Sequence, residues 1–186
     1  MTNLPNILTL SRIALVPPFI GLFYVPGEAA AWITFGLFTL AAVTDFFDGW
    51  LARRLNQISE FGRILDPIAD KLIVAAALVM LAVQYDAPVI PVVAILCREL
   101  LIAGLREGLA GRLTLPVSRL GKWKTASQMT AIALLLIAPA FSALSAPLGL
   151  AGEALLWLAA VLTWLSAVFY IRAVAQQWAG LQRPEA

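Results

Sequence analysis

Four aspartates in one segment are the residues of this sequence best suited to chemistry. Asp45 and Asp48 lie three positions apart, and Asp66 and Asp70 lie four apart. At either spacing two side chains share one face of a helix, so two neighbouring antiparallel helices would direct four carboxylates to one place. Carboxylates gathered there would repel one another and raise each other's pKa. The spacing therefore predicts a metal site, where a pair of ions would clamp a phosphoryl centre during a displacement.

The rest of the composition restricts which metal and which chemistry are possible. The sequence has no histidine and a single cysteine, which excludes Ser–His and Cys–His catalysis, imidazole ligands and an intrachain disulfide. Oxygen must therefore hold any metal, and oxygen ligands favour Mg²⁺ or Mn²⁺. The apolar residues around Cys97 predict a buried, inert thiol.

Small residues and an arginine stand beside the acids. Gly49 and Ala52 follow the first acid pair, and Gly62 lies one turn before the second, which leaves room for a ligand to approach the backbone. Arg53 suits a phosphate. Taken singly, each residue has a simpler explanation, because an aspartate can cap a helix, small residues line helix contacts and an arginine can anchor a cytoplasmic end. The combination at one membrane depth favours the metal site.

Long apolar stretches indicate the elements that must position these residues. The chain is 61% hydrophobic and 13% charged, whereas roughly a quarter of a soluble domain is charged. Six stretches approach the ~20 residues that a spanning helix requires. The sequence thus predicts an all-α, polytopic membrane protein, a single domain over residues 1–186. Its six transmembrane helices are expected at Ile7–Tyr24, Ala29–Phe47, Ala69–Gln84, Val89–Ala110, Lys124–Phe141 and Gly149–Ile171.

Proline and glycine indicate where these helices break. Turns are expected at Pro26-Gly27, Asp86-Ala87-Pro88 and Ser145-Ala146-Pro147. The third helix is expected to extend back through both acids of the second pair, and Pro67 could mark its beginning or a kink.

Basic residues lie on one side of the predicted membrane. The turns near Glu28, Asp86 and Glu153 hold none. Because basic residues mark the cytoplasmic side, both termini and the acids are expected there, in the cytoplasmic (inner) membrane among membrane lipids. Nothing points to nucleic acid as a partner. The basic residues assigned to this side are Arg53, Arg54, Arg63, Lys71, Arg106, Arg112, Arg119, Lys122 and Lys124, with Arg12, Arg172 and Arg183 near the termini.

The acidic segment resembles the signature of the CDP-alcohol phosphatidyltransferases, D-x2-D-G-x2-A-R-x8-G-x3-D-x3-D, at every fixed position. The resemblance implies attack of an acceptor hydroxyl on the β-phosphorus of CDP-diacylglycerol, with CMP leaving, by a homodimeric enzyme that holds two divalent ions. Asp70 would also serve as the general base. The metal ligands implied are Asp45, Asp48, Asp66 and Asp70, and the residues implied to contact the CDP moiety are Gly49, Ala52 and Arg53.

Flanking segments are similar to the branch of the family that uses glycerol 3-phosphate. They read LPNILTLSRIALVP from Leu4, RELLIAGLRE over Arg98–Glu107 and GKWKTASQM over Gly121–Met129. The resemblance also brings Asn6 and Thr9 near the cytidine, although a helix start explains both. A dianionic acceptor needs cations of its own. The residues expected to bind its phosphate are Arg98, which lies deep in the fourth span beside Glu99, together with Arg106, Arg119, Lys122 and Lys124.

Several alternatives stay open. Inositol phosphate, serine or phosphatidylglycerol would use the same chemistry. A divalent-cation transporter would need acids spread through the membrane depth, whereas these cluster at one face. In a non-enzymatic membrane scaffold, Asp70→Asn would be harmless. Arg112 is expected only to set topology or to contact anionic headgroups.

Overall fold

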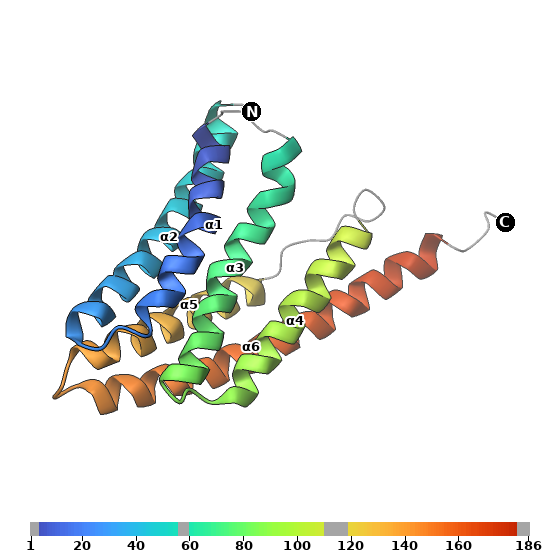
Figure 1. The fold of residues 1–186 in the computed structure, drawn as a ribbon. Coiled ribbons are helices and arrows are strands. Elements are labelled where there is room, and N and C mark those ends of the chain that lie inside the picture. The colour runs from blue at the N-terminus through green and yellow to red at the C-terminus, as the bar shows by residue number, and fades with distance from the viewer. Residues whose placement is uncertain (1–3, 56–59, 110–118, 182–186) are drawn as a thin grey trace. The chain divides into compact units, whose positions relative to one another are not determined.

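The regular elements in the described part of the chain are all helices (Figure 1). The computed structural model describes the backbone of residues 4–55, 60–109 and 119–181, and the side chains of these residues except at 4–6, 8, 45–55, 60–64, 66, 67, 70, 119 and 179–181. This part of the chain contains no strand, which confirms the all-α class. Arg112 and Arg183 lie outside the described residues. The elements are α1 (Leu4–Leu22), α2 (Glu28–Leu55), α3 (Glu60–Gln84), α4 (Val89–Gly108), α5 (Arg119–Ile137), the 3-10 turn η1 (Ala138–Ala140) and α6 (Ser145–Leu181).

The elements form two compact units. The first unit comprises Met1–Ala87 and Ile132–Gly152, and the second comprises Pro88–Ala131 and Glu153–Ala186. Helices α5 and α6 therefore contribute to both units. The single domain predicted for residues 1–186 stays a prediction.

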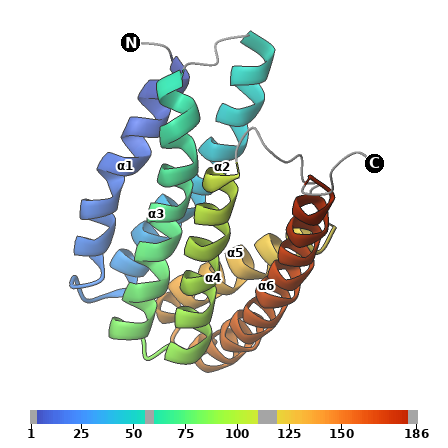
Figure 2. The same cartoon turned by 90° about the vertical axis from the view of Figure 1, so that its right-hand side faces the viewer.

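In the first unit, α1 packs against both α2 and α3. Phe19 of α1 is buried, with its ring centroid 6.5 Å from that of Phe38 on α2. Leu78 and Leu81 of α3 are fully buried as well. The start of α1, the end of α2 and the start of α3 lie together at one end of this three-helix group (Figures 1 and 2). The residues near these three helix ends are thereby brought to one region.

Two of the three predicted helix breaks are confirmed. Gly27 precedes α2 with a φ of 112°, which glycine adopts without strain, and its carbonyl accepts the N–H of Ala30 at 3.1 Å. After α3, Asp86 takes a φ of 52°, and the Ala87 N–H donates to the carbonyl of Leu81 at 3.1 Å, which closes the end of the helix. A proline follows at once and cannot continue the helix.

The third predicted break is wrong. Ser145-Ala146-Pro147 is the first turn of α6, and the chain turns earlier, after η1. A proline in the first turn of a helix needs no intrahelical N–H partner, so it fits a helix start as well as a turn. Other helix bounds also shift. Helix α3 includes both acids of its pair, as predicted, but it begins at Glu60 and not at Pro67.

The second unit joins α4 to the main part of α6. The buried side chains of α4 recur every three or four residues, which is the period of one helix face. Buried residues of α6 recur in the same way and include Leu156, Ala159, Thr163 and Ala167. The indole Nε1 of Trp164 donates to the carbonyl of Ala94 at 3.0 Å and links the two helices.

Many large apolar side chains of these helices are exposed, among them Ile90, Leu100 and Leu150. Cys97 is exposed too, so the prediction of a buried thiol is wrong. Apolar neighbours in the sequence do not distinguish a protein core from a surface that faces an apolar solvent.

Among the described residues, one helix, Ser145–Trp178, is long and apolar enough to cross a membrane. Thr9–Leu22, Glu28–Thr44 and Lys71–Gln84 are apolar but shorter. One such helix is weak evidence for a membrane protein, so the six-span topology stays a prediction.

Candidate active site

Both pairs of aspartates lie on neighbouring helices of the first unit. Asp45 and Asp48 belong to α2, which contacts α3, the helix that holds Asp66 and Asp70. Taking about 1.5 Å per residue, the first pair lies about 15 and 11 Å before the end of α2. The second pair lies about 9 and 15 Å after the start of α3. Since these two helix ends lie together (Figure 1), the backbone carries all four residues at similar depths.

The side chains of these four aspartates lie outside the described residues. Within the described part, no three acidic or cysteine side chains are grouped as metal ligands. The metal site therefore stays a prediction. Its donor set consists only of carboxylates on two contacting helices, and hard divalent cations prefer such oxygen ligands. Gly49, Ala52 and Arg53 belong to the last two turns of α2, beyond its acid pair.

Helix α1 contributes two buried polar residues to the same unit. Thr9 is 1% exposed and Arg12 is 3% exposed, and their spacing of three puts them on one helix face. Arg12 lies about 12 Å from the start of α1, which is near the depth of the acids, and it has an interaction partner. From the sequence, Arg12 was predicted only as one of the basic residues on the cytoplasmic side. Its spacing from Thr9 within an apolar helix was the available signal. Asn6 lies in the first turn of α1.

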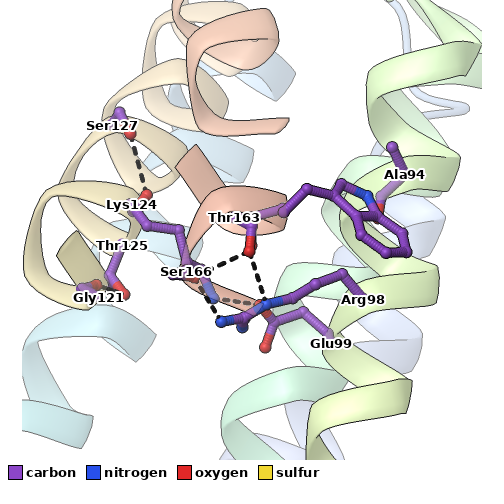
Figure 3. Close-up of polar contacts among 10 residues, drawn as sticks. Ala94, Arg98, Glu99, Gly121, Lys124, Thr125, Ser127, Thr163 and Ser166 are labelled. Atoms are coloured by element: carbon purple, nitrogen blue, oxygen red, sulfur yellow. Dashed lines mark hydrogen bonds and ion pairs between the residues drawn. The ribbon is translucent and has the colours of Figure 1, made fainter. Parts of the chain in front are cut away.

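The second unit contains a buried polar cluster that involves three helices (Figure 3). Arg98 of α4 is 8% exposed. Its Nε donates to the carbonyl of Thr163 at 3.0 Å, and its Nη2 donates to Ser166 Oγ at 2.7 Å, both on α6. Ser166 Oγ in turn donates to the same Thr163 carbonyl at 2.8 Å. The guanidinium is thus fixed to α6 at two points.

Glu99 joins this arginine to α5. Its Oε1 accepts a hydrogen bond from Arg98 Nη1 at 3.0 Å and also forms an ion pair with Lys124 Nζ. Lys124 is 7% exposed, so the cluster contains two buried cations and one carboxylate. Figure 3 shows both cationic side chains reaching the carboxylate from different helices.

The five cations predicted to bind the acceptor phosphate differ in their burial and in their contacts. The structure brings Arg98 and Lys124 together on one carboxylate oxygen. Arg106, in the last turn of α4, and Lys122 are exposed. Arg119 is the first residue of α5, and its side chain is not described. The phosphate-binding role of all five stays a prediction.

Sequence reasoning noted Glu99 for its depth in an apolar stretch but gave it no role. The signal was a carboxylate adjacent to an arginine where charge is costly. Thr163 and Ser166 were missed altogether. Hydroxyl residues in an apolar helix are common at helix contacts, so nothing in their local sequence marks them as partners of a charge.

The chain is similar to known proteins over most of its length. The sequence profile of the CDP-alcohol phosphatidyltransferases matches residues 2–170. A CDP-diacylglycerol–glycerol-3-phosphate 3-phosphatidyltransferase from Rickettsia bellii is 45% identical over 172 residues, covering 92% of this chain and 94% of its own. A protein of the same name from Salmonella typhimurium is 42% identical over 176 residues, with coverages of 92% and 94%. A cardiolipin synthase (CMP-forming) from Oryza sativa is 41% identical over 194 residues, covering 94% of this chain and 58% of its own. The chain belongs to the CDP-alcohol phosphatidyltransferase family.

Proposed function

We propose that this enzyme transfers the phosphatidyl group of CDP-diacylglycerol to glycerol 3-phosphate, giving phosphatidylglycerophosphate and CMP. The observation that carries the proposal is the location of two aspartate pairs near the adjoining ends of α2 and α3. The names of the relatives from Rickettsia and Salmonella, which match nearly the whole chain, support the choice of acceptor.

Asp45, Asp48, Asp66 and Asp70 would hold Mg²⁺ or Mn²⁺, with two ions expected. Metal dependence is general in this family, and a donor set of four carboxylates without histidine fits these hard ions. When bound, the metal neutralises the pyrophosphate and stabilises the charge that develops on the departing CMP.

The chain's own residues bind and activate the two substrates. Asp70, as general base, takes the proton from the acceptor hydroxyl. The hydroxyl oxygen bonds to the β-phosphorus, and the bond from that phosphorus to the bridging oxygen breaks, so the bridging oxygen leaves with CMP. Gly49, Ala52 and Arg53 contact the CDP moiety. Asn6 and Thr9 are assigned to the cytidine.

The acceptor's phosphate is assigned to the cations of α4 and α5. Arg98, Glu99 and Lys124 together carry a net charge of +1, and burial strengthens their attraction for an anion. The three hydrogen bonds that Arg98 donates use three of its five guanidinium N–H groups, which leaves two for a phosphate. Arg106, Arg119 and Lys122 complete the set.

The enzyme is assigned to the inner (cytoplasmic) membrane as a homodimer with six spans, with both termini and the active site on the cytoplasmic side. The exposed apolar side chains of α4 and α6 support contact with lipid tails. The absence of basic residues near Glu28, Asp86 and Glu153 supports this orientation.

A second candidate acceptor is phosphatidylglycerol, which would give cardiolipin. The rice cardiolipin synthase, 41% identical to this chain, favours its inclusion. The chemistry at the phosphorus would be unchanged.

A transfer assay tests both candidates. Purified protein in detergent receives CDP-diacylglycerol, Mn²⁺ and radiolabelled glycerol 3-phosphate, and we expect a lipid-soluble labelled product together with CMP. Cardiolipin formed from phosphatidylglycerol, without product from glycerol 3-phosphate, would favour the second acceptor. No CMP release with either would refute the proposal.

The matched variants in this assay are Asp70→Asn and Asp86→Asn. The first removes the proposed base and should abolish turnover while the protein stays folded. The second changes an exposed aspartate after the other end of α3, where asparagine also accepts a positive φ, and should leave turnover intact. Full activity of Asp70→Asn would contradict the assignment of the base.

A further inference from the structure

We propose that Glu99 is a positioning residue that holds Arg98 and Lys124 as a pair to receive the acceptor's phosphate. This inference rests on the proposed function and adds a residue to which neither the sequence nor the relatives assign a role. The contacts within the polar cluster of the second unit support it (Figure 3).

Glu99 fixes how far apart the two cations lie. One oxygen atom, Glu99 Oε1, contacts both Arg98 Nη1 and Lys124 Nζ. Two nitrogens that contact the same oxygen lie no more than about 6 Å apart, the sum of two hydrogen-bond lengths. Two oxygens of one phosphate can reach cations at such a separation. The carboxylate therefore sets the distance between the two cations.

Glu99 also offsets the repulsion between the two cations. Both cations are buried, at 8% and 7% exposure, and like charges at this distance repel one another strongly away from water. Glu99 contacts both cations at once, so its negative charge offsets their repulsion and keeps them adjacent.

The two cations differ in how firmly other contacts hold them. Arg98 is also fixed to α6 through the Thr163 carbonyl and Ser166 Oγ, so it can stay in place without the carboxylate. Lys124 is a point charge on a flexible stem, and Glu99 is its partner on α4. Glu99 is therefore expected to act on the phosphate through Lys124.

Glu99→Gln has two opposing effects on binding of the acceptor. It removes a negative charge near an anion, which favours binding, and it releases a buried lysine from its counter-ion, which weakens binding. We expect the second effect to dominate because Lys124 would no longer be held beside Arg98. The KM for glycerol 3-phosphate should rise about tenfold or more, the scale of one lost charge-assisted hydrogen bond, while the KM for CDP-diacylglycerol should change less than about twofold.

The experiment measures both KM values for the wild type, Glu99→Gln and Glu99→Asp, and the inhibition constant of inorganic phosphate against glycerol 3-phosphate. Inhibition by phosphate should weaken by the same factor as the KM rises, and Glu99→Asp should recover part of the loss. Glu153→Gln, which changes a carboxylate on a different helix, α6, is the control and should match the wild type. An unchanged or lower KM for glycerol 3-phosphate in Glu99→Gln would overturn the inference.

A second comparison keeps the test decisive if Glu99→Gln folds poorly. The double variant Glu99→Gln/Lys124→Gln removes one charge of each sign and is compared with Lys124→Gln alone. Because Glu99 acts through Lys124, adding Glu99→Gln to Lys124→Gln should not raise the KM for glycerol 3-phosphate further, and removal of the negative charge could only lower it. Additive effects would refute the role of Glu99 and leave the proposed function intact. A wild-type protein that cannot use glycerol 3-phosphate would refute the proposed function itself.

Discussion

Ser166→Ala tests how strongly the second unit depends on the anchoring of Arg98. Ser166 Oγ accepts the Arg98 Nη2 hydrogen at 2.7 Å and donates to the Thr163 carbonyl at 2.8 Å. Alanine removes both contacts and leaves part of a buried guanidinium without an acceptor. A hydrogen bond to a charged group contributes about 1.5–3 kcal/mol, and an unsatisfied buried donor costs a similar amount. We expect Ser166→Ala to lower the free energy of unfolding by about 2 kcal/mol.

Thr163→Val is the matched variant one turn earlier on the same helix. Thr163 Oγ1 is buried and has no hydrogen-bond partner in the described part of the chain, and its contact with Arg98 uses the backbone carbonyl, which valine retains. Valine has nearly the same shape and removes an unpaired hydroxyl that is costly to bury. The free energy of unfolding should stay the same or rise by up to about 1 kcal/mol.

Unfolding of the wild type and of both variants is measured in detergent micelles, and the stabilities are compared from reversible transitions or from their midpoints. We expect the free energies of unfolding of Ser166→Ala and Thr163→Val, two single-hydroxyl changes in one turn of α6, to differ by about 2–3 kcal/mol. If Thr163→Val destabilised the protein as much as Ser166→Ala, the serine hydroxyl would not be the specific partner of Arg98. Ser166→Thr, which keeps a hydroxyl, should retain most of the stability.

Two further predictions concern the first unit. Arg12→Met should lower the free energy of unfolding by about 1–3 kcal/mol, because it removes a buried polar group that has an interaction partner. Arg172→Met, at an exposed position of α6, should change the free energy of unfolding by less than about 0.5 kcal/mol. Equal effects of the two variants in thermal unfolding would contradict a stabilising role for the buried Arg12. Chelation with EDTA should stop CMP release and Mn²⁺ should restore it, and Asp45→Asn should weaken Mn²⁺ binding measured by electron paramagnetic resonance. Undiminished activity after chelation would contradict the metal site.

The sequence predicted those parts of the structure that local chemistry determines. The turns at Gly27 and Asp86 follow from residues that tolerate a positive φ, and the helical positions of the acid pairs follow from the apolar stretches beside them. The start of α6 was missed because proline suits a turn and a first helical turn equally well. The exposure of Cys97 was missed because it depends on which face of α4 meets another helix. The partners of Arg98 lie 65 and 68 positions away on α6, and no local pattern identifies contacts at such separations.

Under the proposed function, the two units supply positive charge to their substrates in different ways. The aspartates of α2 and α3 are anionic and can bind a phosphate only by first holding cations. The cluster of Arg98, Glu99 and Lys124 is already cationic and needs no metal. Under the proposed function, the pyrophosphate of one substrate depends on divalent ions, whereas the phosphate of the other depends on fixed side chains. The two anionic substrates would then be bound independently. When no phosphate is bound, Glu99 would reduce the repulsion between Arg98 and Lys124.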